Sequence, residues 1–187
     1  MDGVLVPERD VSVEPADREP SVSARCSIHR AELVDAPAIQ RLQHLCYRSE
    51  AVLYDDWTIP PLTQTLSGLV AEFATHRILV ARLGEEGEEI VGSVRGRLDS
   101  GVCHVGRLVV HPAARRRGVG SRLMAAIEVE FARAARFEVF TGHLSEDNIR
   151  LYRRLGYADS RTVAVSPRLS LVHLQKPGMA TFGTSPT

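Results

Sequence analysis

The sequence predicts an α/β (α+β) fold built on a single mixed, mostly antiparallel sheet that is flanked by helices. Of the 187 residues, 44% are hydrophobic and 25% are charged, a balance typical of one soluble globular domain. Segments with the period of a strand alternate along the chain with segments with the period of a helix. The order of these segments, a run of antiparallel strands followed by a strand-helix-strand unit, requires both strand directions in one sheet.

We expect the domain to occupy residues 25–176. Residues 1–24 carry prolines among charged residues and serines without a sustained apolar period, which predicts a flexible N-terminal arm. Residues 177–187 are short, polar and interrupted by glycine and proline, which predicts a flexible C-terminal tail. The N-terminus lacks the basic and apolar regions of a signal peptide, so we expect a cytoplasmic protein.

The first half of the domain begins with a strand and a helix. Asp35 and Pro37 supply the N-cap and the early-turn proline of that helix, which carries Ile39, Leu42, Leu45 and Cys46 on one side. A loop and a second amphipathic helix follow, and then two alternating segments that are joined by a glycine- and glutamate-rich turn and predict a hairpin. In order, we predict a strand at 28–33, a helix after Asp35, a loop at 54–61, a helix at 62–74 and strands at 77–83 and 89–98.

The second half contains the strand-helix-strand unit. A turn at Asp99–Gly101 leads into a strand at 102–110, and after Pro112 the period changes. Apolar residues then recur at helical spacing and predict a long amphipathic helix with Leu123, Met124, Ile127, Phe131 and Ala134 on its apolar side. Gly156 is the expected C-cap of the last helix. The remaining segments are a strand at 137–141, a helix at 146–155 and closing strands at 161–165 and 169–174.

Composition excludes several classes of function. The 23 lysine and arginine residues balance the 23 aspartate and glutamate residues, so no overall positive field attracts nucleic acid or an anionic membrane. No stretch approaches the roughly 18 apolar residues of a membrane helix. Cys26, Cys46 and Cys103 are odd in number and form no C-x-x-C pair, which argues against a disulfide framework and against a metal site.

The strongest chemical signal is the stretch from Val105 to Ser121, in which a strand ends at Pro112 and Arg-Arg-Arg-Gly-Val-Gly-Ser opens a helix. The first-turn amides of a helix have no partner within it, and together with the helix dipole they form an anion site. Gly118 and Gly120 lack Cβ atoms, so phosphate oxygens can approach the backbone closely. A structural strand-to-helix turn beside solvent-exposed arginines would have the same sequence. This motif alone therefore leaves open whether the segment binds phosphate or is only a turn.

A second motif follows the long helix. Asn148 and Tyr152 share one helical face because they are four residues apart, and Gly156-Tyr157 comes after them. In this order, V-x-P, R-x-x-G-x-G, a long helix and N-x-x-x-Y-x-x-x-G-Y resemble the GNAT superfamily of acyl-CoA-dependent N-acetyltransferases. The resemblance covers roughly residues 27–175 and is most specific over residues 105–157.

The resemblance implies a cofactor site. It implies that the strands at 102–110 and 137–141 splay apart to form a slot for acetyl-CoA, the co-substrate, and that no metal is needed. Tyr152 would donate a proton to the departing thiolate as general acid. Backbone groups of Leu108, Val109 and Val110 would bind the pantetheine arm, with Asn148 along it. The pyrophosphate would lie against Arg115, Arg116, Arg117, Gly118, Val119, Gly120 and Ser121.

Two positions depart from the pattern of the superfamily. Ser145 stands seven residues before the tyrosine, where an asparagine is common, whereas Asn148 stands four before it. The strand glutamate that serves many members as catalytic base is missing, since its neighbourhood reads Cys-His-Val-Gly-Arg from Cys103. A base is needed because an alkylamine is protonated at neutral pH and only its neutral form attacks a thioester. His104 is our first candidate, and His143 and Glu72 are the others.

The acceptor side is expected at the loop 54–61 and on the strand at 89–98. Tyr54, Asp55 and Trp57 suit a cationic ligand through charge pairing and a cation-π contact. Arg95 suits a carboxylate instead. The sequence leaves open whether the acceptor is a polyamine, an amino acid, an aminoglycoside or a protein N-terminus.

Two functions from different classes remain. The first is an N-acetyltransferase that moves an acetyl group from acetyl-CoA to a primary amine of a small molecule or peptide, by direct attack in a ternary complex. The second is a CoA-binding sensor or pseudoenzyme of the same fold, suggested by the missing glutamate. We also expect a homodimer, because the closing strands would otherwise expose an edge.

Overall fold

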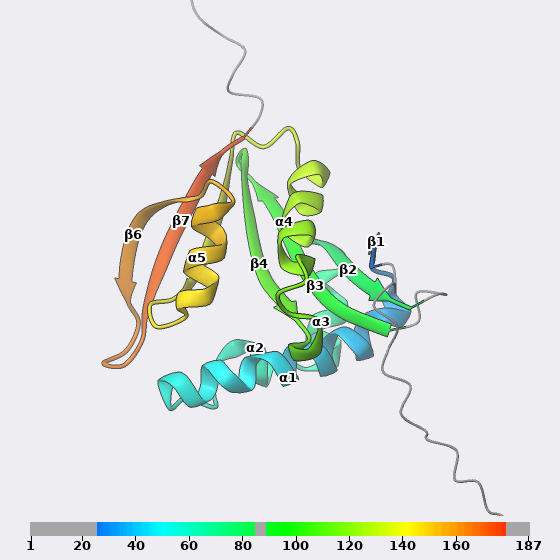
Figure 1. Ribbon diagram of the computed structural model, residues 1–187, viewed down its shortest axis with the longest axis horizontal. Coiled ribbons are helices and arrows are strands. Elements are labelled where there is room, and N and C mark those ends of the chain that lie inside the picture. The colour runs from blue at the N-terminus through cyan, green and yellow to red at the C-terminus, as the bar shows by residue number, and fades with distance from the viewer. Residues whose placement is uncertain (1–25, 85–88, 179–187) are drawn as a thin grey trace, which may run out of the picture.

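The computed structural model describes residues 26–84 and 89–178 (Figure 1). The predicted N-terminal arm, residues 85–88 of the predicted hairpin turn and most of the predicted C-terminal tail lie outside the described residues. In chain order the elements are β1 (Ser27–Arg30), a 3-10 turn (Leu33–Asp35), α1 (Ala36–Tyr54), α2 (Pro60–Thr63), α3 (Leu66–Glu72), β2 (Arg77–Leu83), β3 (Glu89–Asp99), β4 (Val102–Val110), a second 3-10 turn (Pro112–Ala114), α4 (Val119–Glu130), β5 (Arg136–Gly142), α5 (Glu146–Arg154), β6 (Ala158–Ala164) and β7 (Ser170–Pro177).

The strands form one seven-stranded mixed sheet in the order β1-β2-β3-β4-β5-β7-β6. Every neighbouring pair is antiparallel except β4 and β5, which are parallel. The predicted fold class is therefore confirmed. The parallel pair is joined through α4, as a strand-helix-strand connection requires.

Both faces of the sheet are covered. On one face, Leu123, Met124 and Ile127 of α4 are fully buried and pack with residues of β2–β5, β7 and α5 in the largest core cluster. On the other face, Ile39 of α1 and Leu69 of α3 pack against β2. Burying a side chain of this kind removes enough apolar surface from water to favour folding by about 1.5–3 kcal/mol. Two-sided burial explains why β2 is a continuous apolar run.

The sheet splits between β4 and β5. Val102, Cys103 and His104 of β4 pair with Arg136, Phe137 and Glu138 of β5, and within the described residues this pairing goes no further. Beyond it, β4 continues along β3 to Val110, while β5 continues along β7 to Gly142. Figure 1 shows the two halves diverging, with α1 running across the open end.

A bulge in β4 lies within the split region. Between the pairs Ser93↔Val109 and Arg95↔Gly106, one residue of β3 stands opposite two residues of β4. Arg107 in the bulge has a left-handed backbone, with φ 51°. A bulge leaves an unpaired residue and bends the strand, and bulges are frequent beside active sites.

Several boundaries differ from the prediction. The helix predicted at 62–74 is two helices, because Thr65 caps α3 by accepting a hydrogen bond from the Gly68 amide at 3.1 Å. The long helix ends at Glu130, although Ala134 is buried as expected. The first strand ends at Arg30, and the closing strands begin and end at other residues than predicted. The hairpin strands are confirmed. The C-cap of α5 is Leu155, and the glycine predicted there, Gly156, follows it in a left-handed conformation with φ 89°.

No helix in the described ranges is long and apolar enough to cross a membrane.

Candidate active site

The edge of β4 that faces β5 is the first component of the site. Val109 is buried against Leu42 and Cys46 of α1, while Leu108 and Val110 are half-buried against the main core. These side chains fix the strand, but on the β5 side no described strand pairs with it beyond His104. Backbone groups on such an edge can hydrogen-bond an extended chain that is added alongside. The three residues predicted to bind pantetheine therefore lie at an open strand edge.

The N-terminus of α4 is the second component. Gly118 precedes the helix with φ 77°, a left-handed conformation that glycine adopts without strain. The first helical hydrogen bond joins the Arg122 amide to the Gly118 carbonyl at 3.0 Å. No side chain caps this end, and the first turn holds no acidic residue. The amides of residues 119–121 therefore point toward a position that suits an anion.

The position of Gly120 shows that this end of α4 borders the split. A Cβ atom at Gly120 would lie 3.5 Å from Leu151 of α5 and 3.7 Å from Val110 of β4. These are ordinary contact distances, so the missing side chain faces the space between β4 and α5. The first turn of α4 therefore lies between β4 and α5.

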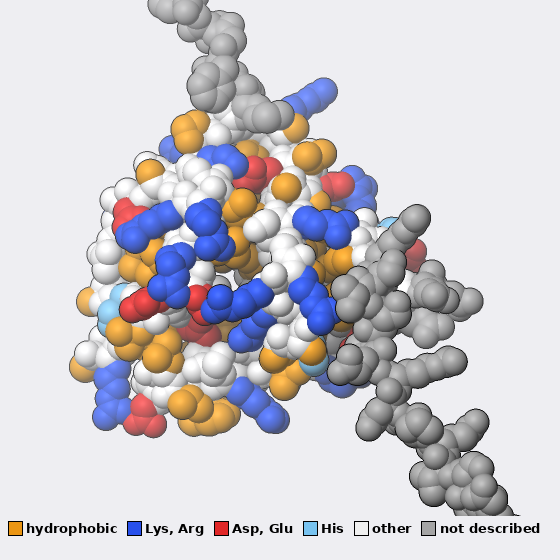
Figure 2. Space-filling view, in the orientation of Figure 1, with side chains coloured by type: hydrophobic (Ala, Val, Ile, Leu, Met, Phe, Trp, Pro, Cys, Tyr) orange, Lys and Arg blue, Asp and Glu red, His pale blue; other side chains and the backbone are white. Residues whose placement is uncertain are grey.

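Basic side chains surround the same region. Figure 2 shows lysine and arginine side chains gathered around a hollow over the N-terminal end of α4 and over α5. Arg115, Arg116 and Arg117 are exposed, and the Nε of Arg115 donates to the Val110 carbonyl at 3.2 Å. The pKa of Asp147 on α5 lies below its usual value, chiefly because it accepts a hydrogen bond from Arg150 and secondarily because Arg116 and Arg115 are near. The arginine loop and the start of α5 are therefore neighbours.

Tyr152 and Asn148 come from α5, as the motif predicts. Asn148 donates from Nδ2 to the Thr141 hydroxyl at 3.4 Å, which ties α5 to the end of β5. Tyr152 is 6% exposed, with its ring 6.0 Å from that of Tyr157. Burial raises the pKa of Tyr152, and the neighbouring Tyr47 and Glu50 raise it further. Its hydroxyl therefore keeps its proton at neutral pH and can donate it.

A polar cluster at the end of α1 was not predicted. The Ser145 hydroxyl donates to the Glu50 carboxylate at 2.8 Å and lies 3.3 Å from the Tyr54 hydroxyl, which accepts from the Leu144 amide at 2.8 Å. Tyr47, Glu50 and Tyr54 lie at positions i, i+3 and i+7 of one helix, so they share a face. The spacing in the sequence indicates that these three side chains share a helix face. It does not indicate the contact between Glu50 and Ser145, which are 95 positions apart in the chain.

The candidate bases lie in different surroundings. His104 is at the last paired position before the split, and its Nδ1 lies 3.6 Å from the Glu138 carboxylate. His143 accepts a hydrogen bond from the Ser170 amide at 3.1 Å through Nδ1 and packs against the Tyr54 ring. Glu72 forms an ion pair with Arg95. Of the three, only His143 contacts the cluster at the end of α1.

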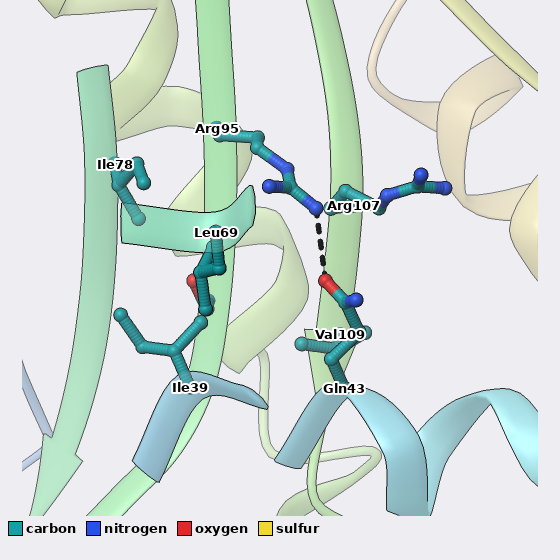
Figure 3. A pocket seen from close by; sticks show the side chains of 8 residues that line it. Ile39, Gln43, Leu69, Ile78, Arg95, Arg107 and Val109 are labelled. Carbon is teal, nitrogen blue, oxygen red and sulfur yellow. Dashed lines mark hydrogen bonds between the residues drawn. The ribbon is translucent and has the colours of Figure 1, made fainter. Parts of the chain in front are cut away.

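Arg95 lies in a small pocket between the helices α1 and α3 and the sheet. Figure 3 shows its guanidinium directed toward Gln43, to which it donates at 2.9 Å, while Arg107 points the other way. It also donates to Gln64 at 3.2 Å and pairs with Glu72. Burial lowers its pKa to about 9, so it is still a cation at neutral pH. The charge that was predicted to receive an acceptor carboxylate already has an internal counter-ion.

The remaining predicted acceptor residues lie at the end of α1. Tyr54 is 4% exposed, and its hydroxyl belongs to the polar cluster. Asp55 follows it in a left-handed conformation and pairs with Arg168 of the β6–β7 turn. Trp57 is 56% exposed. The structure thus gathers these side chains beside the open end of the sheet, whereas Arg95 lies apart, beneath α1 and α3.

No group of three or more His, Cys, Asp or Glu side chains that could hold a metal ion occurs in the described residues.

A profile described as the acetyltransferase (GNAT) family matches residues 37–157. The chain belongs to the GNAT acetyltransferase family. The match contains the β4 edge, the glycine loop and both predicted α5 residues, so the resemblance on which the cofactor site was predicted is confirmed.

Solved structures of the family share the fold of this GNAT domain. A phosphinothricin acetyltransferase of Sinorhizobium meliloti, solved in complex with acetyl-CoA, superposes with a TM-score of 0.67 at 18% identity, over 87% of this chain and 93% of that one. The ribosomal-protein-S18-alanine N-acetyltransferase of Escherichia coli gives a TM-score of 0.66 at 14% identity, over 87% of this chain and 100% of that one. No curated protein matches the sequence. At these sequence identities, the structural similarity shows that this chain shares the fold of the two proteins.

Proposed function

We propose that this GNAT protein is an N-acetyltransferase that transfers an acetyl group from acetyl-CoA to a primary amine of a small molecule or peptide. The observation that carries the proposal is the open edge of β4 leading to the uncapped N-terminus of α4. A pantetheine chain needs the first feature and a pyrophosphate needs the second. The family relative from Sinorhizobium meliloti was solved with acetyl-CoA, which supports this choice of ligand.

In this proposal the amine attacks the thioester directly in a ternary complex. The bulge at Arg107 and Leu108 leaves backbone groups of β4 free of a β3 partner, where they can bind the thioester carbonyl. Tyr152 stands across the split on α5 and donates its proton to the departing thiolate. Tyr152 can fill this role because a phenol keeps its proton at neutral pH and so has one to donate.

The acceptor approaches from the end of α1, where Asp55 and Trp57 are exposed. An exposed carboxylate and an indole ring favour a cationic amine. Arg95 and Asp55 each already have an ion-pair partner, Glu72 and Arg168 respectively, so the preference for a cation rests on the exposed indole of Trp57.

The cofactor half of the proposal is tested by calorimetric titration with acetyl-CoA. Gly120→Glu would place bulk and negative charge between α4 and α5, so we expect it to abolish binding that is micromolar in the parent. Gly120→Ala is the matched control, since its Cβ would meet neighbours only at ordinary contact distances. Equal affinity of the parent and Gly120→Glu would refute the placement of the phosphate site, and absence of binding in the parent would refute the function.

The transferase half is tested by thiol release with acetyl-CoA and a panel of spermidine, phenethylamine and an alanine-initiated peptide. The alternative function, a CoA-binding sensor or pseudoenzyme, is favoured by the absence of a carboxylate on β4. It predicts acetyl-CoA binding without transfer to any amine. Transfer at an enzymatic rate to one member of the panel would exclude it.

A further inference from the structure

Glu50 is a half-buried carboxylate that forms no ion pair with any described residue. Within residues 26–84 and 89–178, Asp56 is the other partly buried carboxylate without a cation, and the amide and hydroxyl of Thr58 donate to it at the surface, each at 2.7 Å. The remaining partly buried carboxylates each have a basic partner, in the pairs Asp35–Arg82, Glu72–Arg95, Glu128–Lys176, Glu130–Arg30 and Glu138–Arg136. Burying a carboxylate without a cation is costly, so its retention needs a reason.

The position of Glu50 supplies that reason. On one side it contacts Ser145, which follows β5 in the chain. On the other side, Tyr47, one helical turn earlier, has the guanidinium of Arg107 5.9 Å from its ring centre. The negative charge of Glu50 also raises the pKa of Tyr152 on α5. Glu50 therefore stands where α1 crosses the split, between the β4 bulge and the proposed general acid.

We propose that Glu50 is the general base of this enzyme, and that its carboxylate binds the ammonium group of the acceptor and takes its proton, directly or through one water molecule. Ser145 is a positioning residue, because its hydroxyl donates to the carboxylate and fixes its orientation. This inference rests on the acetyl transfer proposed above, and it names the residue that the missing strand glutamate leaves unassigned.

The protonation chemistry agrees with this role. Burial raises the pKa of Glu50, while the hydrogen bond from Ser145 lowers it. A base whose pKa is raised toward the working pH is a stronger proton acceptor. The titratable groups near it are Tyr47 and Tyr54 from α1 and Tyr152 from α5; Arg107 of β4 lies against the Tyr47 ring, and His143 of the loop after β5 lies against the Tyr54 ring.

The transfer balances with these two groups. Glu50 takes one proton from the ammonium, which frees the nitrogen lone pair, and it later releases that proton to solvent. The nitrogen attacks the thioester carbonyl, the C–N bond forms, and the C–S bond breaks with its electron pair on sulfur. Tyr152 gives its proton to the thiolate, and the second proton of the nitrogen restores the Tyr152 hydroxyl through solvent. The sum is one amide, one free thiol and one proton released.

The other candidates are less well placed for this step. His104 lies at the closed end of the β4–β5 pair, beside Glu138. Glu72 is neutralised by Arg95. His143 is exposed, and its Nδ1 already accepts a hydrogen bond.

The first test is Glu50→Gln, which keeps the size of the side chain and an oxygen for Ser145. We expect kcat/KM with the best amine of the panel to fall about 10²-fold or more, while calorimetry gives unchanged acetyl-CoA affinity. The parent should also lose activity as pH falls through the pKa of Glu50, and the variant should lack this acid limb. Glu130→Gln, at the far end of α4, is the matched control and should behave as the parent.

The second test separates a catalytic role from a structural one. Ser145→Ala removes the hydrogen bond that lowers the pKa of Glu50, so the acid limb of kcat/KM should move to higher pH. A residue that only held the loop in place would change stability and leave the position of this limb unaltered.

The results distinguish a failure of the role proposed for Glu50 from a failure of the proposed acetyl transfer. Glu50→Gln with parental kcat/KM and a parental pH profile would overturn the role of Glu50 and leave the transferase intact. A parent that acetylates no amine of the panel would overturn the proposed transfer, and the role of Glu50 with it. Loss of the acid limb in Glu50→Gln together with its upward shift in Ser145→Ala would establish the base and its positioning residue.

Discussion

The ion pair between Arg95 and Glu72 gives a sharp prediction about stability. The Arg95 side chain is 6% exposed and that of Glu72 is 26% exposed. Around them, Gln43 and Gln64 accept from the guanidinium, and Gln64 donates to Glu72 at 2.6 Å. This network joins α1, α3 and the segment between α2 and α3 to β3. Replacing one charged partner alone leaves the other charge without its counter-ion inside the protein.

Removing one partner of a buried ion pair typically costs 3–5 kcal/mol, roughly, in the free energy of unfolding. We expect about 3 kcal/mol for Arg95→Met, the lower end, because Glu72 is partly exposed and keeps its bond from Gln64. Glu72→Leu should cost at least as much, since the cation that remains is the more deeply buried partner. At this chain length, 3 kcal/mol corresponds to a fall of about 6–12 °C in the melting temperature.

The double variant Arg95→Met/Glu72→Leu decides the reasoning, because it buries no unpaired charge. Its loss should be smaller than the sum of the single losses by about 2 kcal/mol or more. Urea unfolding followed by circular dichroism measures all three variants. Asp147→Asn, which breaks an exposed pair with Arg150, is the control and should leave the midpoint unchanged. Single variants within about 0.5 kcal/mol of the parent, or strictly additive losses, would refute the account.

Three further predictions concern catalysis, the contact of Tyr54 at the end of α1 and the oligomeric state. Tyr152→Phe should lower turnover about 10²-fold with little change in acetyl-CoA affinity, and unchanged turnover would remove Tyr152 as general acid. Gly142→Ala should lower the melting temperature, because its Cβ would overlap the Tyr54 ring and hydroxyl. Gly106→Ala, whose Cβ meets no atom within 4 Å, is the control. Equal melting temperatures of the two variants would contradict the contact between Gly142 and Tyr54. We expect a homodimer, since β6 is exposed along its length at the edge of the sheet, and a monomer in sedimentation at micromolar concentration would end that expectation.

The elements that the sequence predicts well are those whose pattern is local. β2 and β3 are adjacent in the chain, and each is a short apolar segment next to the glycine- and glutamate-rich stretch, so the hairpin strands could be located closely. The glycine loop and Tyr152 carry motif residues at fixed spacing, and both lie within the family match over residues 37–157. Local patterns of this kind need no knowledge of the partner segment.

The boundaries that were wrong depend on distant partners. Phe131 continues the helical spacing of α4, but it packs where a Cβ at Gly96 of β3 would lie, 2.7 Å from its ring, and the helix ends one residue earlier. The helix predicted at 62–74 is interrupted just before the Thr65 cap of α3, at Gln64, whose side chain bonds Gln43 and Arg95. Neither contact has a signature in the residues next to it.

The contact between Glu50 and Ser145 could not be predicted for the same reason, and it determines how the proposed role of Glu50 must be tested. β4 and β5 share three paired positions, and beyond His104 the halves of the sheet are joined by the core around α4 and α5 and by polar side chains of α1. Tyr54 accepts from the Leu144 amide and Glu50 accepts from Ser145, both across the split. The carboxylate proposed to take a proton from the acceptor amine thus also belongs to the polar cluster at the end of α1, which connects α1 to the residues after β5. A truncation such as Glu50→Ala would disturb both roles, and lost activity alone would not distinguish them. Glu50→Gln preserves an oxygen that accepts the hydrogen bond from Ser145 and removes only the charge. The presence or absence of an acid limb in the pH profile of this variant therefore reports on proton transfer and not on the polar cluster.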